Sequence, residues 1–152
     1  MYNWFECKVR YDKTLDTGMV KTVTEPYLVD ALSFTEAEER IVKEMEPYLS
    51  GDFTVSDIRR KKFSETFLYG DGDRYYNARL AFLTLDEKSG GEKRTNVNML
   101  VQASSLREAL ETVEEEMNKT MVDYTFLAIS ETAIMDVFPY NGVKDFNEVD
   151  DE

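Results

Sequence analysis

A run of four basic side chains is the part of this sequence that most resembles a binding site. Residues 59–62 (RRKK) gather four of the 18 basic residues, and aromatic residues follow within a few positions. Arginine forks bind phosphate groups at two points, and aromatic rings stack on nucleobases. A pocket built from both would bind a nucleotide-sized anion. We predict these ligand-binding residues: Arg59, Arg60, Lys62, Arg74, Tyr75 and Tyr76.

The same basic run also fits a protected sheet edge. Successive strand residues point to opposite faces, so at most two of the four side chains, with one neighbour, can converge on one anion. Charged side chains on an edge strand also keep sheets from pairing edge to edge. Aromatic residues on strands most often belong to the core. Both interpretations of residues 59–62 stay open from the sequence.

Catalytic signatures are missing from the sequence. The chain has no histidine, which removes Ser-His-Asp and Cys-His pairs and H-E-x-x-H zinc sites. It also has no glycine-rich phosphate loop of the known spacings. Among 31 acids, nothing distinguishes Asp57, Glu65 or Asp136 as a general acid or base. We predict no catalytic residue, no metal site and no cofactor; an enzyme stays open, but a binding protein is favoured.

An internal repeat supplies the elements that position these residues. Residues 27–45 align with residues 99–117 at an offset of 72, with nine identities in nineteen positions. The alignment extends to both sides at an offset of 71, and there the basic run falls on residues 130–133 (SETA), which are not basic. We infer that a whole unit is duplicated and that its first copy has departed from the common pattern at the basic run.

Each copy has the pattern of two strands, a helix and a third strand. The first strand, at residues 4–11 in the first copy, alternates apolar and polar residues, and the second, at residues 23–31, pairs with it as a hairpin. Ser33 with Glu36, and Ser105 with Glu108, form the S-x-x-E pattern that begins a helix. Third strands are predicted over residues 53–69 and 124–138, and both are long enough to need a bulge or a bend.

The predicted fold class is α+β, made by tandem duplication of a β-β-α-β unit, with mainly antiparallel sheet or sheets and two helices packed on one face. Because residues 70–74 (GDGDR) are too few for a flexible linker, we expect one compact domain overall. The predicted parts are repeat 1 over residues 1–69, a turn over 70–74, repeat 2 over 75–138 and an acidic tail over 139–152.

The charge balance narrows the range of partners. With 31 acidic and 18 basic residues, the net charge of −13 repels nucleic acids and anionic membranes and favours a basic protein partner. Charged side chains occur within the first dozen residues, and no apolar run reaches the ~18 residues of a membrane span. We expect a cytoplasmic protein without membrane or nonspecific nucleic-acid binding. A strand edge left open at Pro26 makes a homodimer possible.

Several segments resemble one known family. The similarity lies at WFECKVRY, VTEPYLVDALSFTEAE, FTVSDI, LTLDEKSG and SETAIMDVFPY and covers nearly all of residues 3–140. The chain is similar there to an uncharacterised family of small acidic proteins from gut anaerobic bacteria and their phages, a domain of unknown function. The resemblance implies no catalytic or binding residue. It implies a context of mobile elements, where an accessory or counter-defence role is reasonable.

Two functions follow from the sequence. The first is a non-catalytic binding protein, in the context of a phage or mobile-element accessory protein, that binds or sequesters a small nucleotide-derived ligand through the basic and aromatic residues named above. The alternative is an acidic protein–protein interaction factor or inhibitor that acts on a basic, nucleic-acid-handling partner. The first hypothesis requires the basic side chains to converge, and the second requires acidic surface.

Overall fold

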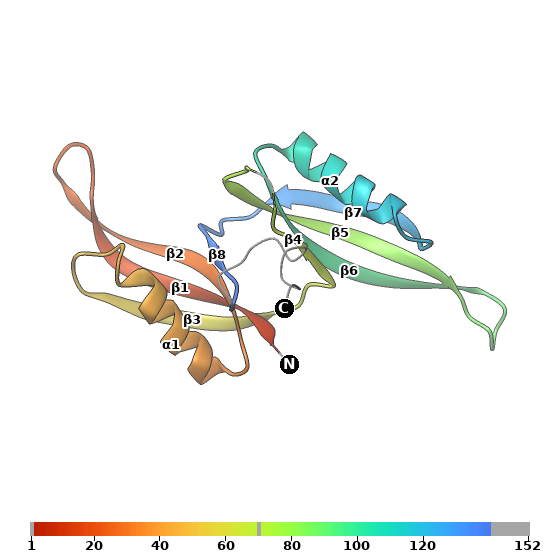
Figure 1. Ribbon diagram of the computed structural model, residues 1–152, viewed down its shortest axis with the longest axis horizontal. Helices are drawn as coiled ribbons and strands as arrows, with labels where there is room; N and C mark the ends of the chain where they lie inside the picture. Colours follow the sequence, from red (N-terminus) through yellow and green to blue (C-terminus); the bar gives the residue numbers. More distant parts are fainter. Residues whose placement is uncertain (1, 70, 141–152) are drawn as a thin grey trace, which may run out of the picture. The chain divides into compact units, whose positions relative to one another are not determined.

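Two four-stranded sheets, each with one helix, make up the described part of the chain, residues 2–69 and 71–140 of the computed structural model (Figure 1). The fold class is therefore α+β. From residue 141 on, the predicted acidic tail lies outside the described residues. The elements are β1 (Asn3–Thr14), β2 (Val20–Ala31), α1 (Phe34–Met45), β3 (Phe53–Lys61), β4 (Glu65–Phe67), β5 (Arg74–Leu85), β6 (Glu92–Ala103), α2 (Leu106–Asn118), β7 (Asp123–Glu131) and β8 (Val137–Phe138).

The chain divides into two compact units. Unit 1 contains residues 2–62 and 133–140, and unit 2 contains residues 63–69 and 71–132. The strand order is β3-β1-β2-β8 in unit 1 and, read the same way, β7-β5-β6-β4 in unit 2. In each unit the three long strands are antiparallel, and the short outer strand is parallel to its neighbour. The two units thus have the same topology.

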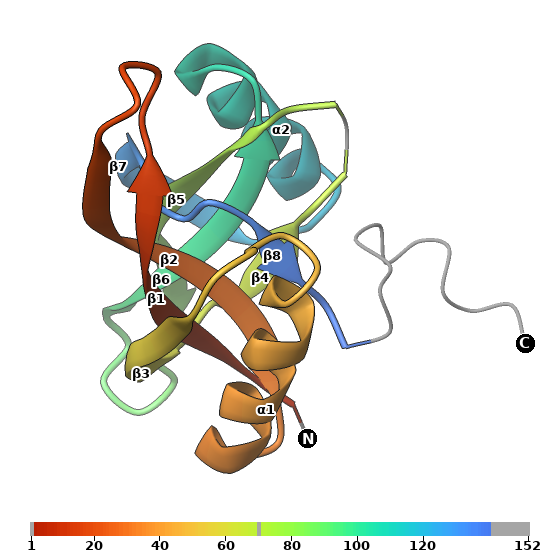
Figure 2. The same ribbon diagram turned by 90° about the vertical axis from the view of Figure 1, so that its left-hand side faces the viewer.

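Alternating apolar residues explain why these segments form half-buried sheets. One face of β1 and β2 and one stripe of α1 bury the core of unit 1, and unit 2 uses the corresponding positions. Helix α1 packs on β1, β2 and β3, and α2 packs on β5, β6 and β7 (Figure 2). The unit 1 core is Phe5, Cys7, Val9, Tyr27, Val29, Ala31, Ala37, Ile41 and Met45; the unit 2 core is Tyr76, Ala78, Leu80, Met99, Val101, Ala103, Ala109, Val113 and Met117.

Both predicted helix starts are confirmed. The Glu36 amide donates to Ser33 Oγ at 3.1 Å, and the Glu36 carboxylate accepts from the Leu32 amide at 2.6 Å. Helix α2 begins in the same way at Ser105 and Glu108. These reciprocal bonds satisfy amide groups that have no partner within a helix. Neither helix has the length and apolar character needed to span a membrane, as far as residues 2–69 and 71–140 are concerned.

The predicted third strands contain the expected bulge, but each of them is broken. Pairing slips by one residue at Ser56 in β3 and at Leu127 in β7. The continuous strands predicted over 53–69 and 124–138 are nevertheless wrong, because each ends and a separate short strand follows.

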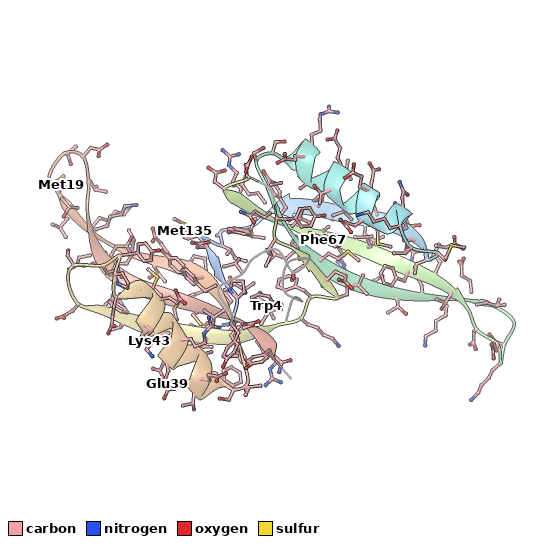
Figure 3. All side chains as sticks on the ribbon, in the orientation of Figure 1. Trp4, Met19, Glu39, Lys43, Phe67 and Met135 are labelled. Carbon is pink, nitrogen blue, oxygen red and sulfur yellow. The ribbon has the colours of Figure 1, made fainter. Side chains whose placement is uncertain are left out.

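These short strands cross to the other unit. Strand β4 lies at the end of predicted repeat 1 yet pairs with β6 of unit 2, and β8 lies at the end of predicted repeat 2 yet pairs with β2 of unit 1. Figure 3 labels Phe67 on β4 and Met135 on the segment that leads into β8. The Ser64 amide donates to the Asn98 carbonyl, and the Met135 amide donates to the Pro26 carbonyl, both at 2.8 Å. Equivalent backbone hydrogen bonds therefore hold the segments that lead into β4 and β8 against β6 and β2.

Candidate binding site in unit 1

Two tyrosines share one carboxylate oxygen on the core face of unit 1. Tyr11 on β1 donates its hydroxyl to Glu25 Oε1 at 2.9 Å, and Tyr27 donates to the same atom at 3.3 Å. Glu25 Oε2 lies 3.8 Å from Lys13 Nζ, and the Glu25 side chain is 15% exposed. Because Val9 pairs with Glu25 and Cys7 pairs with Tyr27, the cluster points to the same side as the core. Its hydrogen bonds offset the cost of holding a carboxylate there.

Both phenols of this cluster keep their protons. Burial and the hydrogen bond to Glu25 raise the pKa of Tyr11 to about 12. Burial and the charge of Glu25 also raise the pKa of Tyr27. Each hydroxyl is therefore a neutral hydrogen-bond donor at physiological pH, unlike a general base, which must give up its proton.

Tyr11 should make unit 1 lose stability in alkali. An unfolded tyrosine has a pKa of about 10, whereas folded Tyr11 has a pKa of about 12. A group with a raised folded pKa stabilises the fold fully below its unfolded pKa, and this contribution disappears as the pH rises through the folded value. We expect the free energy of unfolding to fall less steeply between about pH 10 and about pH 12 in Tyr11→Phe than in the natural protein. Phenylalanine already occupies the equivalent position 82.

Urea unfolding at graded pH measures this effect. The fluorescence of Trp4, the only tryptophan, reports on β1 of unit 1 (Figure 3). Phe82→Tyr in unit 2 is a control that restores the number of phenols without restoring the bond to Glu25. If the free energy of unfolding fell as steeply at alkaline pH in Tyr11→Phe as in the natural protein, Tyr11 would not titrate as described.

A cavity of about 250 Å³ adjoins the two phenols, and we call it the tyrosine cavity. The rings of Tyr27 and Phe138 stack beside it, with centroids 6.0 Å apart and an interplanar angle of 17°. Tyr48 also lines it, with 71% of its surface exposed. Its full lining is Tyr11, Tyr27, Tyr48, Phe138, Asp136, Met45, Leu49 and Met135.

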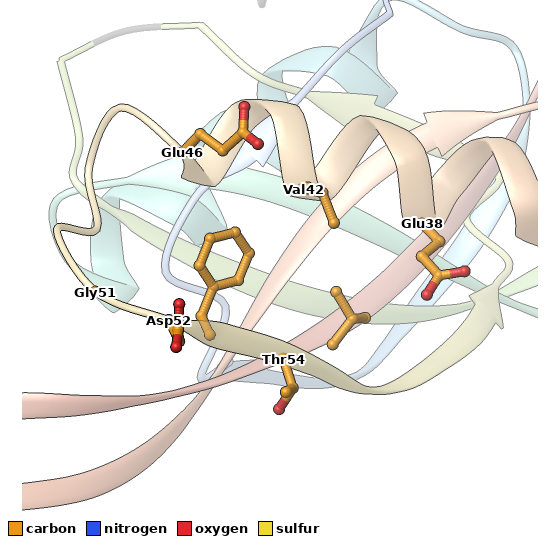
Figure 4. Close-up of a pocket in the computed structure, with 8 residues that line it drawn as sticks. Glu38, Val42, Glu46, Gly51, Asp52 and Thr54 are labelled. Carbon is orange, nitrogen blue, oxygen red and sulfur yellow. The ribbon is translucent and has the colours of Figure 1, made fainter.

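A second cavity, of about 500 Å³, opens between α1 and β3 and is called the acidic cavity (Figure 4). Its lining includes the exposed carboxylates of Glu38, Glu46 and Asp52. A hollow of about 490 Å³ lies along the loop between α1 and β3 and shares residues with both cavities. Nowhere in residues 2–69 and 71–140 do three metal-binding side chains gather closely enough to hold an ion. The two cavities thus offer carboxylates and aromatic rings, and the hollow beside them is also lined by Lys13.

Unit 2 has apolar residues where unit 1 has the tyrosine cluster. The strand registers place Phe82 at the position of Tyr11, Val97 at that of Glu25, and Met99 at that of Tyr27. In unit 2 these three side chains pack in or against the core. A unit of this topology therefore folds without the two phenols and the carboxylate, and the cluster is specific to unit 1.

The predicted basic residues of β3 point in different directions. Arg59 Nε lies 2.8 Å from Asp57 Oδ2 on the exposed side of the strand. The Arg60 guanidinium lies 5.6 Å from the ring centres of both Phe5 and Phe34. Because successive strand residues alternate, Arg59 and Arg60 lie on opposite faces of the sheet. Lys62 follows the strand and is exposed.

The other predicted site residues belong to unit 2. Arg74, Tyr75 and Tyr76 begin β5, whereas Arg59, Arg60 and Lys62 are in unit 1. Arg74 Nε lies 3.9 Å from Glu131 Oε2, and both side chains are about half exposed. Tyr76 is part of the unit 2 core, and Tyr75 points to the opposite face. Anion binding by these six residues stays a prediction.

Sequence reasoning missed the tyrosine cluster, although a signal for it was present. The repeat alignment sets Tyr27 against Met99 and Tyr11 against Phe82, so these two differences between the repeats were visible. The match of Glu25 with Val97 comes from the strand registers. A tyrosine on a strand is most often a core residue, however, and a strand glutamate usually faces water. Only the register shows that these three side chains meet at one oxygen.

Comparison with known proteins identifies the family without assigning a chemistry. Residues 3–140 match the family described as a domain of unknown function, DUF4494. The chain belongs to this family. Neither a curated protein nor a solved structure matches it. The geometry of unit 1 is therefore the basis for assigning a function to this DUF4494 domain.

Proposed function

We propose that this DUF4494 domain is a non-catalytic binding protein that recognises a basic protein partner through the cavity-lined end of unit 1. The observation that carries the proposal is the pair of cavities whose linings combine tyrosine rings with carboxylates and contain no basic side chain. The overall charge of −13 would attract a basic partner over distance. The cavities would then provide the local contacts that make the encounter specific.

The chemical state of the site supports binding over catalysis. Tyr11 and Tyr27 hold their protons, and both oxygens of Glu25 have partners within unit 1. Burial raises the pKa of the Cys7 thiol to about 12, which keeps it from acting as a thiolate nucleophile. A residue poised to attack a substrate needs an adjacent base or a lowered pKa, and neither Tyr11 nor Cys7 has one.

A nucleotide-derived ligand is the other function considered from the sequence, and we rank it second. Arg59 already pairs with Asp57, and Arg60 lies over two aromatic rings, so an anion would have to displace these contacts. An origin among gut anaerobes and their phages, an accessory role in counter-defence and the duplication of the unit rest on the sequence alone. They stay predictions.

A basic peptide tests the proposed function. We expect the full chain to bind an acetylated, amidated peptide of alternating glycine and arginine, and we expect the affinity to fall steeply as salt is added. Neutralising the acidic cavity by Glu38→Gln, Glu46→Gln and Asp52→Asn should weaken binding about tenfold or more, because three carboxylates leave one surface. Isothermal titration calorimetry at graded salt measures both effects.

A matched variant separates a local site from net charge. Glu111, Glu114 and Glu115 are exposed on α2 of unit 2, and changing all three to glutamine removes the same amount of charge. We expect this control to weaken binding much less than the variant of the acidic cavity. Equal losses would show that only net charge matters, and an absence of binding at low salt would refute the proposed function.

A further inference from the structure

We propose that the tyrosine cavity of unit 1 binds the guanidinium group of one arginine side chain of the partner. This inference rests on the proposed function and adds the chemical class that the site selects.

The size of the cavity suits a side chain. Its volume of about 250 Å³ lies below the roughly 300 to 1,000 Å³ of pockets that enclose drug-sized ligands. A whole nucleotide would need more room, whereas the end of one long side chain fits. The rim residue Tyr48 is 71% exposed, so a side chain projecting from a partner has an open way in.

The walls suit a flat cation. Tyr27 and Phe138 present rings that stack at 6.0 Å, and Tyr11 and Tyr48 add two more rings to the lining. Cations are attracted to the faces of such rings, and a guanidinium group can also stack on them because it is planar. A lysine ammonium has the charge but lacks the planar shape.

The polar groups match the donors of arginine. Asp136 lines the cavity, and its Oδ1 accepts a hydrogen bond from the Val137 amide at 2.8 Å. Glu25 lies behind the lining, where it accepts hydrogen bonds from the lining residues Tyr11 and Tyr27. Lys13 is the cation nearest to Glu25, but its side chain is 49% exposed and 3.8 Å away, so a closer cation could replace it. Arginine carries five N–H donors in a rigid fork, which allows it to bind a carboxylate at two points. Tyr11 and Tyr27 would hold Glu25 in place.

The comparison between the units argues against a purely structural role for this cluster. Unit 2 has Phe82, Val97 and Met99 at the corresponding positions and makes a core of the same design. Burying a carboxylate beside tyrosines in unit 1 is costly compared with such apolar packing. A ligand that uses the carboxylate and the rings would account for their presence.

Three peptides and two variants test the inference in the full chain. The peptides alternate glycine with arginine, with lysine or with citrulline, which has the shape of arginine without its charge. We expect the arginine peptide to bind about tenfold more tightly than the lysine peptide and the citrulline peptide to bind very weakly. Tyr48→Ala should weaken binding of the arginine peptide about tenfold, whereas Leu85→Ala, which changes a residue of similar exposure (72%) at the end of β5, should not.

The outcomes separate this inference from the proposed function. Because Tyr48 is exposed, its replacement should leave folding intact, which circular dichroism checks. Equal binding of the arginine and lysine peptides, or unchanged binding by Tyr48→Ala, would overturn the arginine site. The proposed function would survive that result if neutralising the acidic cavity still weakened binding. If no basic peptide bound at low salt, both would fall.

Discussion

Gly72→Ala is expected to lower the free energy of unfolding of unit 2 by about 2 to 3 kcal/mol. A Cβ atom at position 72 would lie 2.2 Å from the carbonyl carbon of Ala103 and 2.4 Å from its Cα atom. Both are backbone atoms at the end of β6, so no side-chain rotation can relieve the overlap. The Gly72 carbonyl also accepts a hydrogen bond from Gln102 Nε2 at 2.7 Å, and a shifted backbone would lose it.

Urea unfolding followed by circular dichroism measures the loss. The matched control is Gly51→Ala in unit 1, because a Cβ atom there would have no heavy atom within 4 Å. This control should change the unfolding free energy by less than about 0.5 kcal/mol. If both alanine variants were equally stable, the close approach of Gly72 to Ala103 would not exist in solution.

Arg40→Thr should cost about 3 to 5 kcal/mol, because it leaves a half-buried carboxylate without its partner. Arg40 Nη1 lies 3.1 Å from Asp30 Oδ1 and also donates to the Asp30 carbonyl. Arg40 Nη2 donates to the carbonyls of Phe138 and Pro139 at 3.2 and 3.1 Å. The side chains of Arg40 and Asp30 are only 14% and 16% exposed. Arg40 on α1 thus forms hydrogen bonds both with β2 and with the end of β8.

The pH dependence of this variant follows from Asp30. Burial raises the pKa of Asp30, and the charge of Arg40 partly opposes the rise. Without Arg40 the folded pKa should rise further. A raised folded pKa means that stability is fully present at acid pH and is lost as the pH rises through the folded value. The difference in unfolding free energy between the natural protein and Arg40→Thr should therefore grow from about pH 4 to neutral pH.

Two further variants check the assignment to a buried ion pair. Adding Asp30→Gln to Arg40→Thr recreates the residues of unit 2, Gln102 and Thr112, and should recover part of the loss and flatten the pH dependence. Arg59→Ala breaks an ion pair whose side chains are 71% and 39% exposed, so it should cost at most about 1 kcal/mol. A deficit for Arg40→Thr no larger than for Arg59→Ala would contradict a structural role of Arg40.

Local sequence patterns were sufficient to predict most of the secondary structure. The S-x-x-E boxes at Ser33 and Ser105 begin α1 and α2 because the bonds that they form span only a few residues. Alternation of apolar residues predicted the long strands for a similar reason, since it depends on neighbouring side chains. A bulge or bend in each third strand was also predicted, but its position at Ser56 and at Leu127 was not.

The partners of the short strands could not be predicted in this way. Strand β4 has three residues and β8 has two, too few for a periodic pattern to indicate which sheet they join. Their pairing is parallel and connects segments distant in sequence. Backbone bonds at Ser64 and Met135 decide it, and no local propensity encodes such a bond.

In the candidate site, too, some features followed from the sequence and others only from the tertiary structure. The sequence alone determined the acidic charge, the lack of histidine chemistry and the places where repeat 1 departs from repeat 2, because these depend only on composition and alignment. The tertiary structure decided which of the residues that differ between the repeats contact one another. Strand register brings Tyr11 and Tyr27 to one oxygen of Glu25, and the crossing of β8 brings Asp136 to the same cavity. Such distant residues meet only when the sheet forms, so no pattern within a short window could reveal the cavity.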